Sequence, residues 1–106
     1  MAKFLVKGSY TTDGVKGILK DGGTARRAAV QKTVEGLGGS QEAFYFAFGD
    51  DDVYVIVDMP DNASAAAISM VVNASGAVQI EMVPLLTPEE ADEAAKKSVD
   101  YRPPGG

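Results

Sequence analysis

The strongest candidates for chemistry in this chain are polar side chains that interrupt apolar runs. Asp58 stands inside the run VYVIVDM at residues 53–59. An unpaired carboxylate in such surroundings is costly and holds its proton more tightly, which suits acid/base work. Lys7 is its expected partner, because the strands of Lys7 and Asp58 should be neighbours. Asp58, Tyr54 and Lys7 are therefore the candidate catalytic residues, and a purely structural Lys7–Asp58 ion pair is the alternative.

A wider set of polar side chains is expected on the same side of the predicted sheet. It would surround a small apolar or aromatic molecule held between the sheet and a second copy of the chain. The alternative is an interface that binds no ligand. The candidate ligand-binding residues are Lys7, Ser9, Tyr45, Tyr54, Asp58 and Glu81.

Thr24, Arg26 and Arg27 form a second candidate site in the stretch GGTARR at 22–27. Thr24 fits the N-cap of a helix, whose first turn carries positive potential. Two arginines in that turn oppose the helix dipole and call for a negative group nearby. That group is an anionic ligand, the carboxylates of 50–52, or acids from another subunit. The stretch is not a P-loop, because it lacks the Gly-Lys-Ser/Thr ending.

Asp50, Asp51 and Asp52 form an acidic run in a predicted hairpin turn. Carboxylates attract divalent cations, but a calcium site needs about six or more oxygen ligands, and the run lacks EF-hand spacing. We therefore expect a solvated turn or a partner for the arginines, and no metal site.

The composition excludes several kinds of active site. The 106 residues include no Cys and no His, which excludes thiolate nucleophiles, the Ser-His triad and the usual zinc sites. No cofactor is expected. The net charge of −5 argues against a nucleic-acid partner. The chain has no apolar run of membrane-spanning length and no signal peptide, so no membrane partner and a cytoplasmic location are expected.

The charge of the chain is unevenly divided along its length. Basic residues concentrate in 1–34 and acidic residues in 35–106, with no basic residue from 33 to 95. Surfaces of opposite sign could therefore meet across a subunit contact. The alternative is a solvated surface whose acids favour solubility.

The alternation of apolar and polar residues predicts the elements that position these groups. Strands are expected at 3–10, 41–48, 53–59 and 77–83. Helices are expected at 12–20 and 25–37, at about 62–75, and after Thr87. This order predicts an α+β, ferredoxin-like βαββαβ fold with a four-stranded antiparallel sheet over residues 1–86. Residues 87–106 are expected to form a short C-terminal helix and an extended Pro-rich tail that pack on the same domain.

The same alternation assigns the strand residues to the two faces of the sheet. The face covered by helices is expected to take Phe4, Val6, Phe44, Phe46, Phe48, Val53, Val55, Val57, Val78, Ile80 and Met82. The opposite face takes the candidate ligand-binding residues with Leu5, Ala43, Ala47, Ile56, Gln79 and Val83. No helix remains to cover this second face, so we expect a dimer that packs sheet against sheet.

The sequence resembles the GYD-domain family. The resemblance rests on FLVKGSYTTDGVKGILKDGGTARRAAV, on EAFYFAFGDDDVYVIVDMPDNASAAA, and on NASGAV followed by PLLTPEE, which together span nearly the whole chain. The chain departs from the family pattern at Gly49, which three aspartates follow in place of an aromatic residue. The resemblance implies a dimeric α/β-barrel assembly, of the kind shared with small ligand-binding and cofactor-free oxygenase families.

Three functions are compatible with these observations. The preferred one is a homo-oligomeric small-molecule-binding or accessory protein with a pocket between the sheet and its dimer mate. The second is a cofactor-free monooxygenase or isomerase that uses Asp58 and the tyrosines. The third is a structural interaction module.

Overall fold

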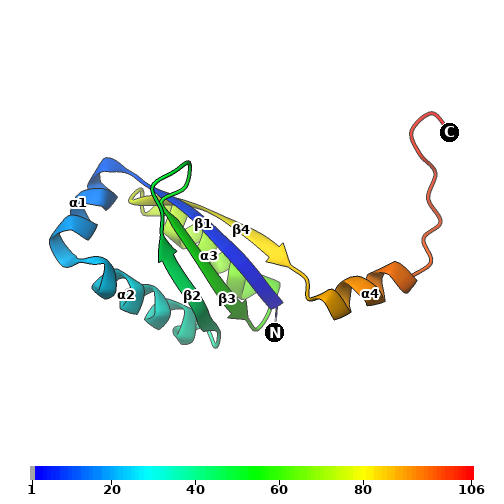
Figure 1. Cartoon of the computed structure of the whole chain (residues 1–106), viewed down its shortest axis with the longest axis horizontal. Coiled ribbons are helices and arrows are strands. Elements are labelled where there is room, and N and C mark those ends of the chain that lie inside the picture. Colours follow the sequence, from blue (N-terminus) through cyan, green and yellow to red (C-terminus); the bar gives the residue numbers. More distant parts are fainter. Residues whose placement is uncertain (1) are drawn as a thin grey trace.

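A computed structural model describes residues 2–106 of the chain (Figure 1). The elements in order are β1 (Ala2–Tyr10), α1 (Thr12–Asp21), α2 (Gly23–Gly36), β2 (Ser40–Phe46), β3 (Val53–Met59), α3 (Asn62–Ala74), β4 (Val78–Leu85) and α4 (Pro88–Lys96). The four strands form one antiparallel sheet in the order β2-β3-β1-β4. This confirms the predicted α+β, ferredoxin-like arrangement.

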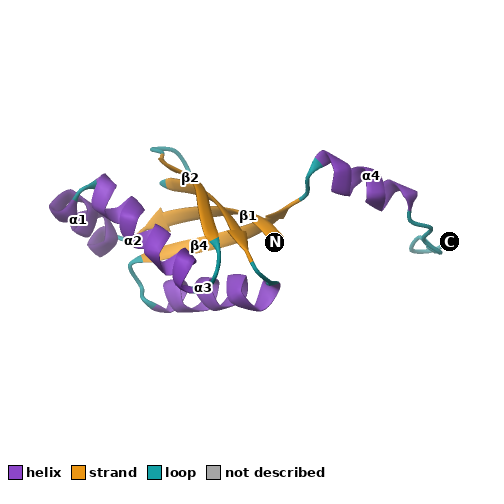
Figure 2. Ribbon diagram, turned by 90° about the horizontal axis from the view of Figure 1, so that it is seen from below, coloured by secondary structure: helices purple, strands orange, loops and turns teal. Residues whose placement is uncertain are grey.

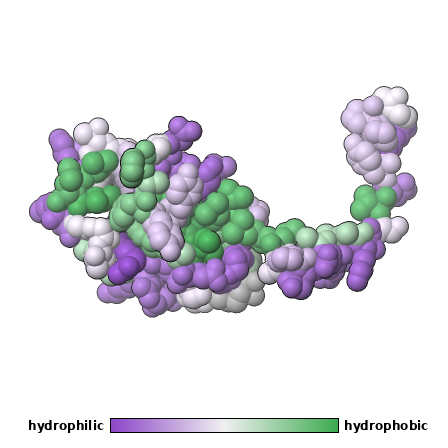
Figure 3. All heavy atoms as spheres, in the orientation of Figure 1, coloured by the Kyte–Doolittle hydropathy of each residue, from purple (hydrophilic) through white to green (hydrophobic). Residues whose placement is uncertain are grey.

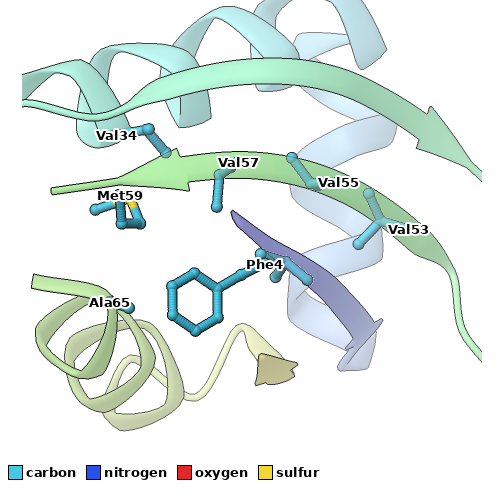
Figure 4. Packing of buried hydrophobic residues seen from close by; sticks show 8 residues of the cluster. Phe4, Val34, Val53, Val55, Val57, Met59 and Ala65 are labelled. Carbon is cyan, nitrogen blue, oxygen red and sulfur yellow. The ribbon is translucent and has the colours of Figure 1, made fainter. Parts of the chain in front are cut away.

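Helices α2 and α3 cover one face of the sheet (Figure 2). Helix α2 packs on β2 and α3 packs on β4. The buried core lies between these helices and the sheet (Figure 4). Its members are Phe4, Val6, Val34, Val53, Val55, Val57, Met59 and Ala65. The opposite face, called the open face below, is covered by no helix of the described chain.

The predicted core is wrong at the end of β2. This strand carries a bulge between Gln41 and Ala43 and ends at Phe46, which is 44% exposed. The amide of Ala47 then donates a hydrogen bond of 2.7 Å to the carbonyl of Asp52 and closes the hairpin turn. Phe48 lies in this turn and is fully exposed, because the sheet has ended before its side chain could join the core.

The helix ends follow the capping signals in the sequence, with one exception. Asp61 caps α3 by accepting from the amide of Ser64 at 2.7 Å, and Thr87 forms a capping box at the start of α4. The exception is Thr24, which lies inside the first turn of α2. Gly22 holds the N-cap position instead, with φ of +91° and no side-chain cap. A residue without Cβ is needed there because the chain turns sharply from α1 into α2.

The start of α1 lies against the backbone that precedes β4. The carbonyl of Ala77 accepts hydrogen bonds from the amide of Thr11 at 3.0 Å and from its hydroxyl at 3.1 Å. A Cβ at Gly14 would clash with that carbonyl oxygen, whereas a Cβ at Gly17 would meet no atom within 4 Å. Gly14 therefore permits a close approach that any other residue would prevent.

Residues 86–106 form a C-terminal arm that extends away from the sheet (Figure 1). Every residue of the arm is exposed, including Leu86, Val99 and Tyr101 at 66%, 77% and 70%. The Cα radius of gyration is 16.7 Å, against about 13 Å for a compact domain of this length. The expectation that the C-terminal helix and tail pack on the same domain is therefore not met within the chain.

Candidate functional site

The open face carries all six predicted ligand-binding residues. The strand registers pair Lys7 with Tyr54 and with Glu81, Ser9 with Gln79, and Tyr45 with Tyr54. Asp58 follows on β3, an even number of positions from Tyr54, and therefore lies on the same face. The assignment of these residues to one face is thus correct as geometry, and their role in binding stays a prediction.

The predicted pair of Lys7 and Asp58 does not form. In the register of β1 and β3, Lys7 lies opposite Tyr54 and Lys3 lies opposite Asp58. The Nζ atom of Lys3 is 3.4 Å from Oδ2 of Asp58 and 2.8 Å from Oε1 of Glu42. The alternation of β1 puts Lys3 and Lys7 on the same face, but only the register decides which of them meets Asp58.

Lys3 is the residue of this cluster that sequence reasoning missed. Its hydrogen bond to Glu42, supported by Asp58, raises the pKa of the Lys3 ammonium above its ordinary value. The side chain of Asp58 is 24% exposed, so it is neither unpaired nor enclosed in apolar surroundings. Asp58 is therefore paired with Lys3 in place of Lys7, and its catalytic role stays a prediction.

A second charged cluster lies at the other end of the open face, around Asp51. Its carboxylate is 3.6 Å from Nζ of Lys7, and it accepts from the hydroxyl of Ser9 at 3.4 Å and from that of Tyr54 at 3.5 Å. Asp58 lies four positions from Tyr54 along β3, a separation of about 13 Å at the usual rise of a strand. The three catalytic candidates are thus divided between two clusters.

An apolar row separates these two clusters. Leu5 lies opposite Ile56 on β3 and opposite Val83 on β4, and Ile56 in turn lies opposite Ala43 on β2. These four side chains, called the apolar row below, cross the sheet and are only half-buried. Figure 3 shows hydrophobic surface gathered over the sheet beside the root of the arm, with hydrophilic residues around it.

The acidic turn has partners other than the arginines. Asp51 joins Lys7, and the carboxylate of Asp52 accepts from the amide of Tyr10 at 2.9 Å. No ion pair between this turn and Arg26 or Arg27 occurs in residues 2–106. Nor does that part of the chain gather three acidic side chains in a metal-binding arrangement. The contact between the acidic run and the arginines, one of the alternatives that the sequence left open, therefore does not form within residues 2–106.

Thr24, Arg26 and Arg27 do not converge on one site. Arg27 and Thr24 are exposed and border a shallow hollow beside β2. Arg26 is half-buried and turns inward, with Cζ 5.8 Å from the centre of the Tyr10 ring. Thr24 and Arg27 thus share one face of α2, whereas Arg26 turns toward Tyr10, so the structure does not bring all three side chains to one site.

The helix-covered side of the sheet contains an apolar cavity of about 140 Å³. Its walls are core side chains of the sheet, α2 and α3, among them Val6, Val55, Ile68 and Val72. Only three lining residues, Tyr10, Arg26 and Thr33, carry polar side-chain atoms. Arg26, Ala29, Thr33, Val72 and Val78 also border an open groove at the ends of α1, α2 and α3, so this groove adjoins the cavity.

Sequence reasoning did not identify this cavity. The sequence places Arg26 in the first turn of a helix, but the inward direction of its side chain depends on how α2 lies on the sheet. One signal was available. Helix α2 offers the core few large apolar residues, and only Val34 of this helix is buried. A helix that covers its sheet so thinly leaves space beneath it.

Comparison with known proteins identifies one family. A model described as the GYD domain matches residues 4–95, which is nearly the whole chain. No curated protein and no solved structure matches the chain significantly. Within residues 2–106, no helix is long and apolar enough to cross a membrane.

Proposed function

The chain belongs to the GYD domain family, and from that premise we propose that it is a homodimeric protein that binds a small apolar molecule. The observation that carries the proposal is the cavity of about 140 Å³ between the helices and the sheet. An engineered apolar cavity of about 150 Å³ stays dry and binds benzene, so this volume suits a ring or a short chain of about six carbons. The ligand site therefore lies on the opposite side of the sheet from the one that the sequence predicted.

The wall chemistry of the cavity supports binding over an empty packing defect. A void lined by apolar side chains offers water few partners, and an apolar ligand gains contacts that water cannot make. The adjoining groove gives a ligand a way in, since Ala29 and Thr33 border both spaces and are exposed. Such a site binds and positions a molecule without requiring a reaction.

The open face supports the dimer. The half-buried apolar row between the two charged clusters can be covered by a second copy of the chain. In a dimer related by a two-fold axis, the apolar row of one copy would pack against that of the other. Lys3 and Lys7 are each paired with a carboxylate within the chain, so both lysines can meet the partner without becoming unpaired buried charges. The contact would bury Leu5, Ile56 and Val83, which water otherwise reaches.

Ligand binding is tested by titrating the protein with benzyl alcohol and following methyl resonances of the core. We expect saturable shifts confined to residues that line the cavity. Ala29→Leu, which fills the mouth with a larger side chain, should weaken the shifts, whereas Ala95→Leu in the distant arm should not. Spectra that stay unchanged up to the solubility limit of benzyl alcohol would exclude the cavity as a binding site.

The dimer is tested by sedimentation at micromolar concentration, where we expect twice the monomer mass of 11.0 kDa. Ile56→Lys puts a charge in the middle of the apolar row and should give monomers. The control Gln79→Lys adds the same charge on the same face outside the row and should leave the dimer intact. A wild-type protein that sediments as a monomer would remove this part of the proposal.

A further inference from the structure

Arg26 is the one charged residue of 2–106 that lines the cavity. Its Nε atom is buried and finds no hydrogen-bond partner within residues 2–106. None of the ion pairs in that part of the chain includes Arg26. A buried donor without an acceptor loses its hydration and gains nothing in return, so the site favours an acceptor that arrives with a ligand.

Arg26 lies where a ligand in the cavity could reach its side chain. The Tyr10 ring lies 5.8 Å from Cζ and attracts the cation through its π face, which holds the guanidinium beside the cavity. Arg26 also borders the adjoining groove, so it stands where the apolar space meets the solvent. A ligand with its apolar body in the cavity would bring its polar end to this side chain.

The surrounding charges indicate what kind of anion fits. The groove is bordered by two acids, Asp13 and Asp21, and by two bases, Lys20 and Arg26 itself, so its charges balance. Such a neighbourhood has no excess positive charge for a phosphate dianion. A planar carboxylate carries one charge and matches the guanidinium fork with two parallel hydrogen bonds.

Building on the proposed function, we infer that the cavity takes a monocarboxylate with a small apolar body, whose carboxylate pairs with Arg26 at the mouth. The apolar body has about the size of a six-membered ring or a six-carbon chain, which the volume of about 140 Å³ allows. The carboxylate supplies the acceptor that buried Nε lacks. Tyr10 keeps the guanidinium in place for it.

The test compares benzoate, benzyl alcohol and inorganic phosphate by calorimetric titration of the 106-residue chain. Charge-assisted hydrogen bonds add roughly a 10- to 100-fold gain in affinity, so we expect benzoate to bind that much more tightly than benzyl alcohol. Arg26→Met keeps an apolar stem of similar length and should remove the preference. Arg27→Met, its exposed neighbour in the same helix, should retain it.

The remaining outcomes separate this inference from the proposed function. If benzoate and benzyl alcohol bind equally well, or if Arg26→Met leaves benzoate affinity unchanged, the role of Arg26 is overturned while the cavity remains a binding site. If neither aromatic compound binds, both the inference and the proposed function fail. Tighter binding of phosphate than of benzoate would also overturn the inference. Should Arg26→Met not fold, Arg26→Lys keeps the charge without the fork, and we expect it to lose at least half of the benzoate preference.

Discussion

Filling the cavity from its wall is the most direct test of whether this space exists in solution. Val55 is 3% exposed and lines the cavity from β3, so Val55→Ile directs one added methylene into the free volume. Burying a methylene contributes about 0.8 kcal/mol, whereas forcing one into a filled core costs about 1–3 kcal/mol. The two cases differ in sign, which makes the result decisive.

We expect Val55→Ile to raise the free energy of unfolding by about 0.8 kcal/mol and the Tm by about 3–6 °C. Urea titration measures the first quantity, provided that the m value stays unchanged. The same variant should bind benzyl alcohol more weakly, because the added methylene takes part of the ligand's space. Val15→Ile, on the surface of α1 and away from the cavity, is the control and should stay within about 0.5 kcal/mol of wild type.

A loss of about 1 kcal/mol or more in Val55→Ile would refute the reasoning. It would mean that the walls close over the space when the protein is in water. The proposed ligand site would then lose the observation on which it depends, whatever the oligomeric state.

Three further predictions concern stability. Gly14→Ala should lower the free energy of unfolding by about 1–3 kcal/mol, because the added Cβ clashes with the backbone before β4. Gly17→Ala in the same helix meets no such obstacle and should raise the free energy of unfolding by about 0.5–1 kcal/mol. Urea titration compares the two variants, and equal effects would contradict the packing of α1. Lys3→Met should lower the free energy of unfolding at neutral pH, because it removes the ion pair of Lys3. The difference in free energy of unfolding from wild type should vanish as the pH rises through the raised pKa of Lys3, above 10.5, since the pair requires the charged ammonium. A difference that persists at higher pH would argue against the pair. Asp61→Ala should lower the free energy of unfolding at neutral pH, because the amide of Ser64 then loses its acceptor. The difference in free energy of unfolding from wild type should shrink as the pH falls through the lowered pKa of Asp61, below 3.8, since the hydrogen bond favours the ionised carboxylate. Denaturant titrations followed by helix content measure the difference at each pH, and a pH-independent difference would contradict the prediction.

The faces of the strands were predictable because they depend on a local period of two. The alternation of Phe4 and Val6 with Leu5 and Lys7 decides which side chains enter the core, whatever the strand pairs with. The register between β1 and β3 is different. It depends on chain segments about fifty residues apart, and the alternation is equally satisfied when the pairing shifts by two or four positions. For this reason the sequence predicted Lys7 as the ion-pair partner of Asp58, whereas the partner in the structure is Lys3.

The cavity and the direction of Arg26 were out of reach for a different reason. Sequence spacing placed Arg26 in the first turn of a helix, but the angle at which α2 lies on β2 decides whether its side chain points to solvent or inward. Phe48 shows a related limit. The alternation continues through it, but the hydrogen bond that closes the hairpin ends β2 two residues earlier.

The C-terminal arm has a consequence for how this sequence can vary among relatives. No side chain of the arm is buried within the chain, so substitutions there leave the monomer's free energy of unfolding nearly unchanged. Selection for folding alone would therefore let Leu86, Val99 and Tyr101 drift to polar residues. If relatives retain apolar residues at these three positions, the constraint must come from contact with another molecule. Sequence variation in the sheet and its helices would then reflect selection for folding, whereas variation in the arm would reflect selection for association.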